Sequence, residues 1–513
     1  MPLPRQSGIL LHPTALPGPH GAGDLGAAAY HFVDWLASGA QSLWQVLPLG
    51  GVGPGNSPYM SPSAFAGSEL LIDLEQLRDA GWLRDADLSP RPDFPETRID
   101  YAALRAYRLP RLHLAAQRFF ADARHAAQAD YAAFCSEHAG WLDDYALFMA
   151  LDGKYGRHGK VWQEWPAPLA RRKPSALTEA RAQHADECRF WRFCQWLFYT
   201  QWSALRRYAH ERGIEFVGDM PIFVSAHSAD VWAHQQLFDL DAQGRPRVVA
   251  GAPPDYFSAT GQFWGNPLYH WPAHAAEGYA WWIARLAHTF RLCDVVRIDH
   301  FRGFESYWEV PADAETAVGG RWRPGPGIAL FEALRAALAP DGQPLRIIAE
   351  DLGDITPAVD ALRHAAGLPG MRILQFAFDG HCDNPYLPHN HERDAVVYTG
   401  THDNDTTRGW WQGLDSPTQD YVRRYLGVDA RGIEWDLIRA ASASVAALSI
   451  VPMQDVLGLG SEARMNRPGV AEGSWEWRFS WSQLAPWHAA LLADLARVHG
   501  RAGRRRTDRE ARH

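Results

Sequence analysis

Short apolar segments rich in β-branched residues recur along the chain, and each is followed by turn residues and then by a helix-like stretch. These segments are too uniformly apolar for strands with one face in water, so we expect strands that are buried on both faces. Strands of this kind that alternate with helices are typical of a parallel sheet covered by helices. The predicted strands are residues 43–49, 214–218, 294–298, 345–349, 371–376 and 395–398, with a weaker one at 449–453.

The same alternation favours one closed barrel over an open sheet. The chain has 513 residues, and α/β barrels with insertions extend past roughly 400 residues. No GxGxxG motif opens a predicted helix, and neither GxxxxGKS nor GxxxxGKT occurs, so a nucleotide cofactor lacks its usual phosphate-binding loop. We therefore predict an α/β fold, a single (β/α)8 barrel over residues 1–500. We expect its insertions to be mainly helical, with one at about 73–174.

Charge, hydropathy and cysteine content exclude several classes of partner. The net charge is −9 although residues 501–513 are strongly basic, so the remaining chain is acidic and nucleic acid is not an expected partner. We expect the basic end to be a disordered tail. No uninterrupted apolar stretch reaches the roughly 18 residues of a membrane span. Five cysteines without a CxxC pair fit free thiols in a cytoplasmic protein, and no feature requires a protein partner.

Acidic residues stand where four of the predicted strands end. In a parallel barrel the C-terminal ends of the strands form one rim, and this rim carries the catalytic side chains of barrel enzymes. A single acid after a strand is as readily explained as the cap of the next helix, but four acids at one rim favour chemistry. These residues are Asp219, Asp299, Glu350 and Asp403, the last preceded by His402.

Two of these acids have contrasting surroundings. Arg297 stands two residues before Asp299, so on a strand both side chains point the same way and the guanidinium favours an ionised carboxylate. Glu350 follows the apolar residues 347–349, a setting that raises the pKa of a carboxyl group. We expect the two acids to face each other from neighbouring strands. One ionised and one protonated carboxyl group is the pair that retaining glycoside chemistry requires.

Aromatic residues gather in the segment 251–271. Tryptophan is the most frequent aromatic residue, with 23 against 22 Phe and 17 Tyr, and its flat ring stacks well on the apolar face of a sugar. We expect this segment to be a loop, and so aromatic a loop either packs into the core or forms a lid over a substrate cleft; the residues alone leave both alternatives open. Its aromatic members are Tyr256, Phe257, Phe263, Trp264, Tyr269 and Trp271.

Motifs spread from residue 7 to residue 406 resemble those of the amylomaltases, the bacterial 4-α-glucanotransferases of the α-amylase superfamily. They are SGILLHPTALPGPHGAGDLG (7–26), GNSPYMSPSAFAG (55–67), GDMPIF (218–223), PPDYFSATGQFWGNPLY (253–269), VVRIDHFRGF (295–304), IIAEDLG (347–353) and YTGTHDNDT (398–406). The resemblance implies a (β/α)8 barrel without a separate C-terminal β domain. It also implies transfer of α-1,4-glucan segments to glucose or another glucan through a covalent intermediate, with no cofactor and no metal.

The resemblance further implies roles for individual residues. Asp299 would be the nucleophile, Glu350 the general acid/base, and Asp403 a third carboxylate that holds sugar hydroxyls and distorts the ring. Together with the aromatic segment, it predicts a set of substrate-binding residues. These are Tyr59, Asp219, Tyr256, Phe257, Trp264, Asn266, Arg297 and His402.

Departures from the superfamily narrow the choice of activity. Hydrolytic α-amylases carry Asn-His shortly after the acid that matches Asp219, whereas this chain has Phe223 and Val224, as amylomaltases do. This difference favours a transferase, with an α-glucan hydrolase as the alternative. Pro54 stands where the family often has an aromatic residue that holds a second glucan chain, which weakens the case for a second glucan groove.

Two other classes of protein are compatible with the residues. A metal-dependent hydrolase on the same barrel would have enough ligands, although barrel metal sites usually place two His closely on one strand. A glycan-binding protein would need the aromatic residues but not two carboxyl groups in different protonation states. The possible metal ligands are His300, His402, Asp219, Asp299 and Asp403.

Overall fold

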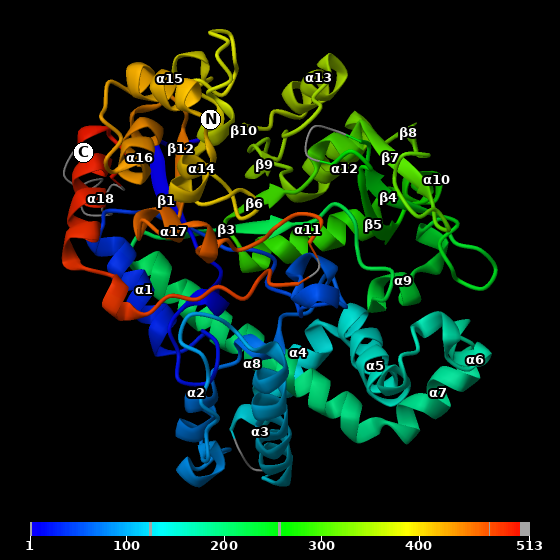
Figure 1. The fold of residues 1–513 in the computed structure, drawn as a ribbon. Coiled ribbons are helices and arrows are strands. Elements are labelled where there is room, and N and C mark those ends of the chain that lie inside the picture. Colours follow the sequence, from blue (N-terminus) through cyan, green and yellow to red (C-terminus); the bar gives the residue numbers. More distant parts are fainter. Residues whose placement is uncertain (1–2, 123–125, 255–257, 471, 503–513) are drawn as a thin grey trace.

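Eight parallel strands form the centre of the molecule in the computed structural model (Figure 1), which describes residues 3–122, 126–254, 258–470 and 472–502. Their order in the sheet is β10-β11-β12-β1-β2-β3-β6-β9. The strands are β1 (Gln6–Leu10), β2 (Leu43–Gln45), β3 (Glu215–Met220), β6 (Val295–Ile298), β9 (Ile347–Ala349), β10 (Gly370–Ile373), β11 (Ala395–Tyr398) and β12 (Leu448–Pro452).

The sheet curls into a barrel because its two end strands, β9 and β10, meet. The backbone N–H of Ala349 donates to the carbonyl of Pro369 across this seam, at 2.9 Å. Around the barrel the strands follow one another in chain order, which is the topology of a (β/α)8 barrel. The predicted fold class and all seven predicted strands are thus confirmed. Strand β1 was not predicted because it is only five residues long and begins with Gln6-Ser7-Gly8, which is not an apolar segment.

Helices cover the outside of the barrel, and aromatic side chains fill the space between the layers. Trp44 of β2 lies edge-on to Phe32, with ring centroids 4.9 Å apart, and Phe216 of β3 lies 4.7 Å from Trp202. This packing explains why the strands are apolar on both faces. The covering helices are α1 (Ala27–Ser38), α8 (Ala185–Glu211), α11 (Ala280–Leu292), α12 (Ile328–Leu338), α13 (Pro357–Ala366), α14 (Thr407–Gly413), α15 (Ser416–Leu426), α16 (Ile433–Ala443), α17 (Met453–Val456) and α18 (Pro486–Val498).

A helical insertion separates β2 from β3 and forms the lobe at the bottom of Figure 1. The longest of its helices α2 to α7 is α3. The Asp100 side chain accepts the N–H of Ala103 and so caps the first turn of α3. This lobe occupies the region in which the sequence predicted a helical subdomain. Its helices are α2 (Leu74–Asp79), α3 (Tyr101–Ala121), α4 (Ala127–Glu137), α5 (Ala139–Tyr155), α6 (Ala167–Ala170) and α7 (Pro174–Gln183).

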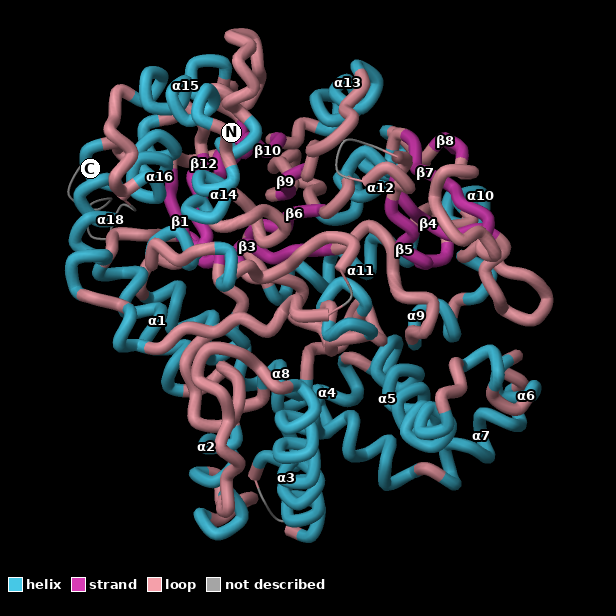
Figure 2. Tube along the Cα trace, viewed as in Figure 1, coloured by secondary structure: helices cyan, strands magenta, loops and turns pink. Residues whose placement is uncertain are grey.

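Two further insertions, one between β3 and β6 and one between β6 and β9, together form a four-stranded antiparallel sheet of order β5-β4-β7-β8, which lies to one side of the barrel (Figure 2). The expected loop over 251–271 is in part regular structure, since this segment holds the end of β4, all of β5 and the start of α10 (Trp271–Ala276). These strands were not predicted because they are short and contain Gly and Pro. Tyr256 and Phe257 lie outside the described residues. The strands are β4 (Val248–Ala252), β5 (Gln262–Pro267), β7 (Ser306–Pro311) and β8 (Arg321–Pro324).

The C-terminal boundary needs one correction. Arg501, which we assigned to the disordered tail, is buried and donates to the carbonyls of Gln6, Ser442 and Ala447 at 2.7–3.0 Å. It was misplaced because it begins a run of arginines, whereas its partners are distant in the chain. Within the described residues, no strand follows β12. In that same part of the chain, no helix is both long and apolar enough to cross a membrane.

Candidate active site

The barrel brings the predicted acids to one rim. Asp219 lies near the end of β3 and is paired in register with Arg297 of β6. Asp299 directly follows β6 and Glu350 directly follows β9, while His402 and Asp403 stand in the loop after β11. Because all these strands are parallel, their C-terminal ends lie on the same side of the barrel.

Arg297 joins two of the acids. Its Nη1 lies 2.7 and 2.8 Å from the two carboxylate oxygens of Asp219, and its Nη2 lies 2.9 Å from Oδ1 of Asp299. Only 3% of the Arg297 side chain is exposed. The predicted orientation of Arg297 and Asp299 to the same side is therefore confirmed, and the buried guanidinium fixes the direction in which Asp299 points.

Glu350 is held between two backbone donors. The N–H of His300 donates to Oε2 at 2.6 Å, and the N–H of Leu352 donates to Oε1 at 2.9 Å. His300 has a left-handed backbone conformation with φ of 52°, which is uncommon outside glycine. Burial and the nearby charge of Asp299 raise the pKa of Glu350 to about 8, so at neutral pH Glu350 carries a proton.

Asp299 and Glu350 belong to neighbouring strands, as the sequence predicted. Ile298 of β6 pairs with Ala349 of β9, and each acid is the next residue along its strand. The ladder continues past them, since the Glu350 N–H donates to the carbonyl of Ile298 at 3.0 Å and the Phe301 N–H donates to the carbonyl of Glu350 at 3.0 Å.

Tyr59 links Asp219, and through it Arg297 and Asp299, to the loop after β11. Its hydroxyl donates to Oδ2 of Asp219 at 2.8 Å and lies 2.9 Å from Nε2 of His402. His402 Nε2 is also 3.3 Å from Oδ2 of Asp403. Burial alone would lower the pKa of His402, but the Asp403 carboxylate raises it above its ordinary value. Six predicted site residues are thus connected: Tyr59, Asp219, Arg297, Asp299, His402 and Asp403.

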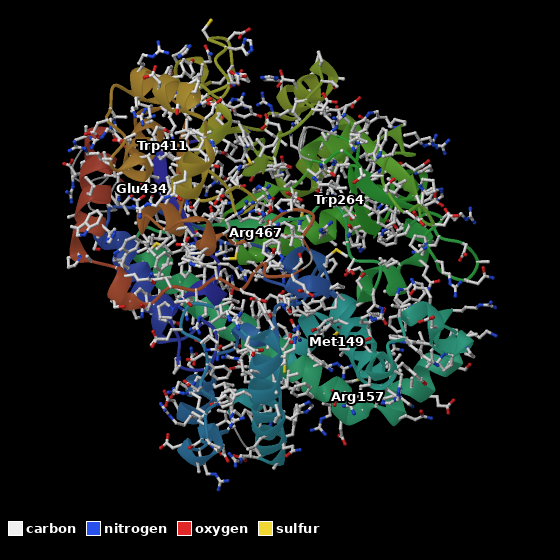
Figure 3. The ribbon with its side chains drawn as sticks, viewed as in Figure 1. Met149, Arg157, Trp264, Trp411, Glu434 and Arg467 are labelled. Carbon is white, nitrogen blue, oxygen red and sulfur yellow. The ribbon has the colours of Figure 1, made fainter. Side chains whose placement is uncertain are left out.

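Asn466 is part of the site and was not predicted. Its Nδ2 donates to Oδ1 of Asp403 at 2.6 Å, and the guanidinium of Arg464 donates to the Asp403 carbonyl at 3.1 Å. Although burial alone would raise it, the pKa of Asp403 lies below its ordinary value because of His402 and Asn466. No strand directly precedes Asn466, so its position in the sequence does not mark it as a site residue. Figure 3 labels its neighbour in the chain, Arg467.

Trp264 and Asn266 reach the site from strand β5 of the small sheet. The ring of Trp264, labelled in Figure 3, lies edge-on to the imidazole of His300 with centroids 4.8 Å apart. Its indole N–H donates to the side-chain oxygen of Gln262 at 3.1 Å. The Asn266 side chain donates to the carbonyl of Val224 at 2.9 Å, so it ties β5 to the loop after β3.

The five residues considered as metal ligands are not gathered into one coordination sphere. Among the described residues, no group of three or more His, Cys, Asp or Glu is arranged to hold a metal ion. The oxygens of Asp219 and Asp299 face the Arg297 guanidinium, and Asp403 faces Asn466 and His402. The negative charges of these carboxylates are instead balanced by hydrogen bonds and ion pairs with protein side chains.

The raised pKa of Glu350 leads to a prediction about stability. Between the ordinary pKa of 4.5 and the folded-state pKa of about 8, the folded protein holds a proton that the unfolded chain has released. The free energy of unfolding therefore falls as pH rises through this window. Glu350→Gln removes this loss, so its stability relative to the wild type should increase steadily from pH 5 to pH 8 and then level off. Urea denaturation across this range measures it; a constant difference between the two proteins would contradict the raised pKa.

Comparison with known proteins identifies the family. A family model described as 4-alpha-glucanotransferase matches residues 11–484. The chain belongs to the 4-α-glucanotransferase family. A 4-alpha-glucanotransferase of Thermus thermophilus is 50% identical over 504 residues, covering 97% of this chain and 99% of the relative. One from Synechocystis is 49% identical over 500 residues, covering 97% and 98%.

Solved structures agree with this 4-α-glucanotransferase assignment. The amylomaltase of Streptococcus agalactiae in complex with acarbose superposes with a TM-score of 0.93 at 37% identity, covering 97% of this chain and 100% of that one. The amylomaltase of Corynebacterium glutamicum has a TM-score of 0.76 at 19% identity, covering 96% and 75%. The second comparison supports the fold alone.

Proposed function

We propose that this 4-α-glucanotransferase transfers segments of α-1,4-glucan to the 4-hydroxyl of glucose or another glucan by a retaining double displacement. Family membership establishes the transferase class. The observation that carries the mechanism is the pair on neighbouring strands: Asp299, oriented by Arg297 at 2.9 Å, and Glu350, whose pKa of about 8 leaves it protonated. A nucleophilic carboxylate beside an acidic carboxyl group is what a retaining enzyme needs.

The first step forms a glycosyl ester. Asp299 attacks the anomeric carbon while Glu350 gives its proton to the glycosidic oxygen, so the leaving part of the glucan departs with a free hydroxyl. Forming the ester removes the negative charge of Asp299, which is one cause of the raised pKa of Glu350. The pKa of Glu350 therefore falls, and Glu350 can accept the proton of the acceptor hydroxyl that attacks the ester in the second step.

The remaining polar residues are suited to hold the sugar ring at the bond that breaks. Asp403 keeps a charge because His402 and Asn466 lower its pKa, and an ionised carboxylate is a strong acceptor for sugar hydroxyls. Tyr59 and Arg297 fix the orientation of Asp219. We assign Asp403, Asp219, Tyr59, His402 and Arg297 to substrate binding and ring distortion at this position.

Incubation with maltotriose alone tests the activity. A transferase should produce glucose together with a ladder of maltodextrins longer than maltotriose, because the released segment is passed to another sugar. The α-glucan hydrolase alternative would produce only shorter sugars. The same assay after dialysis against EDTA should give an unchanged rate, since the proposed steps use only side chains of this chain and need no cofactor. Thin-layer or anion-exchange chromatography reads out both results.

Trp264 is expected to favour sugar over water as the acceptor. The glycosyl ester is open to water, and an indole beside His300 offers a stacking surface for the incoming glucose. Such stacking is worth on the order of 0.5–1.5 kcal/mol, so Trp264→Ala should raise the ratio of hydrolysis to transfer by up to roughly tenfold. The measurement compares the gain in reducing ends, which only hydrolysis produces, with the yield of maltodextrins longer than the donor.

Phe263→Ala is the matched control for this prediction. Phe263 is the preceding residue of β5 and is 42% exposed, and on a strand its side chain points to the opposite face from Trp264. Its truncation should leave the ratio unchanged. If Trp264→Ala lowered hydrolysis and transfer in equal proportion, Trp264 would be a general clamp or a packing residue, and this account of acceptor choice would be wrong.

We also propose a cytoplasmic location and action without a protein partner. The five cysteines are unpaired, which suits a reducing compartment. Fractionation of the native cells with an antibody against the chain tests the location, and gel filtration at assay concentration tests whether activity elutes with the isolated chain.

A further inference from the structure

The barrel has one seam that its backbone ladder does not close. Strands β9 and β10 stand at the two ends of the sheet order. Across this seam the N–H of Ala349 donates to the carbonyl of Pro369 at 2.9 Å. Two residues after Pro369, the N–H of Met371 is accepted by a side chain, Oδ1 of Asp351, at 2.6 Å. The seam thus lies directly beside Glu350, the residue that precedes Asp351.

The Asp351 carboxylate is buried and paired with two arginines. Only 5% of its side chain is exposed, and Oδ2 lies 3.3 Å from Nε of Arg363 and 3.4 Å from Nη1 of Arg372. One guanidinium comes from α13 and the other from β10. A buried carboxylate that is compensated in this way has little freedom to move, so it fixes the peptide that connects it to Glu350.

Gly370 provides the room for the Asp351 carboxylate. A Cβ atom at position 370 would lie 2.1 Å from Oδ2 and 2.8 Å from Cγ of Asp351. Any side chain at this position must therefore push the carboxylate away from Met371. The sequence thus offers two independent ways to break the same contact, one by removing the acid and one by filling its space.

We propose that Asp351 is a positioning residue for the general acid, because it replaces the missing ladder at the β9–β10 seam and so holds Glu350 against the N–H groups of His300 and Leu352. The proposal rests on the acid/base role proposed above for Glu350. When Asp351 no longer ties β9 to β10, the segment 350–352 is free to shift towards the solvent, and the Glu350 carboxyl group loses both its orientation and its burial.

Loss of burial should be visible in the pH dependence. The groups that face Glu350 are Asp299 and Arg297 from β6, the neutral His300, and Tyr386 from the segment after β10. Of these groups, Tyr386 is influenced by the charge of Asp351, and Gly370→Ala leaves that charge in place. A fall in the pKa of Glu350 would therefore move the alkaline limb of the kcat profile to lower pH, because the acid is deprotonated earlier.

The experiment compares Asp351→Ala, Gly370→Ala and Asp351→Asn on two donors. For maltotriose, whose leaving group needs a proton, the two alanine variants should lose about tenfold to hundredfold in kcat with a smaller change in KM. Their alkaline limb should shift down by about one pH unit. For formation of the glycosyl ester from maltosyl fluoride, whose leaving group needs no proton, the loss should stay within about threefold. Asp351→Asn should retain most activity, because its amide oxygen still accepts the Met371 N–H.

Asp294→Ala is the matched control. Asp294 precedes β6 at the opposite end of the barrel, accepts the Phe216 N–H at 2.8 Å and pairs with Arg206 and His210. Its loss removes the same kind of tie and should lower stability without changing the pH profile or the ratio between donors. A folded Asp351→Ala or Gly370→Ala variant that lost equally on both donors, or kept the wild-type alkaline limb, would overturn the proposal.

Glu350→Gln, measured in parallel, separates the two possible failures. If Glu350→Gln loses activity on maltotriose but still forms the ester from maltosyl fluoride, while Asp351→Ala and Gly370→Ala show no such difference between the donors, only the positioning role of Asp351 is wrong. If Glu350→Gln itself loses equally on both donors, the acid/base assignment fails first. Should Asp351→Ala not fold, Gly370→Ala and Asp351→Asn still decide the question, since both keep a polar side chain at residue 351.

Discussion

Replacing Asp299 by Asn is expected to lower glucan transfer by on the order of 10⁴-fold or more, the scale on which loss of a catalytic nucleophile acts in other enzymes. The amide has nearly the same shape as the carboxylate but cannot form the glycosyl ester. Its oxygen can still accept the hydrogen bond from Arg297 that is 2.9 Å long in the native enzyme. Affinity for maltoheptaose, measured by calorimetry, should therefore change by less than about threefold.

Asp294→Asn serves as the control for this substitution. It lies five residues earlier, at the other end of β6, and its partners are Phe216, Arg206 and His210 rather than the site. Transfer should stay near the wild-type rate. A variant at Asp299 that bound glucan normally and kept a tenth of its activity would exclude a covalent ester at this residue.

Glu350→Gln is expected to have the second largest effect, a loss of roughly 10²–10⁴-fold on maltodextrins. Glutamine has no proton to give to the leaving oxygen. It also has one oxygen for two donors, so either His300 or Leu352 would lose the partner that it has in the native site. A maltosyl fluoride donor needs no acid, and its first step should proceed within about tenfold of the wild-type rate.

The two donors should also differ in their pH dependence. Wild-type turnover of maltotriose should fall as pH rises through about 8, because Glu350 then loses the proton that it donates. Formation of the ester from maltosyl fluoride should not show this fall. An equal loss on both donors in the Glu350→Gln variant would show that Glu350 is not the acid, and the alkaline limb would then need another origin.

Much of the architecture follows from local sequence, because strands buried on both faces have a composition that exposed strands lack. The segments 43–49 and 395–398 could be recognised for this reason, and the acids that follow such strands meet at one rim whatever the loops do. This is why Asp219, Asp299, Glu350 and Asp403 were found, and why Arg297 could be assigned to the same side as Asp299.

Other parts of the site could not be predicted, because they depend on contacts between residues far apart in the chain. Asn466 reaches Asp403 from 63 residues away, and no periodicity marks it. Strands β4 and β5 are short, and β4 pairs not only with β5 but also with β7, which lies beyond β6 in the chain. Arg501 belongs to a basic stretch of sequence that is typical of a solvent-exposed tail. Only its hydrogen bonds to the distant carbonyls of Gln6 and Ser442 show that it is part of the folded protein.

By itself, the sequence determined the barrel, the rim at which the acids meet and the family, since burial on both faces, strand-end acids and motifs are properties of neighbouring residues. Only the tertiary structure decided which side chains at the rim contact one another and how their charges interact. The charge of Asp299 raises the pKa of Glu350 because β6 and β9 lie side by side, and Asp351 reaches Met371 because the barrel closes there. Electrostatic shifts and hydrogen bonds fall off over a few ångströms, so they depend on distances that exist only after the chain has folded.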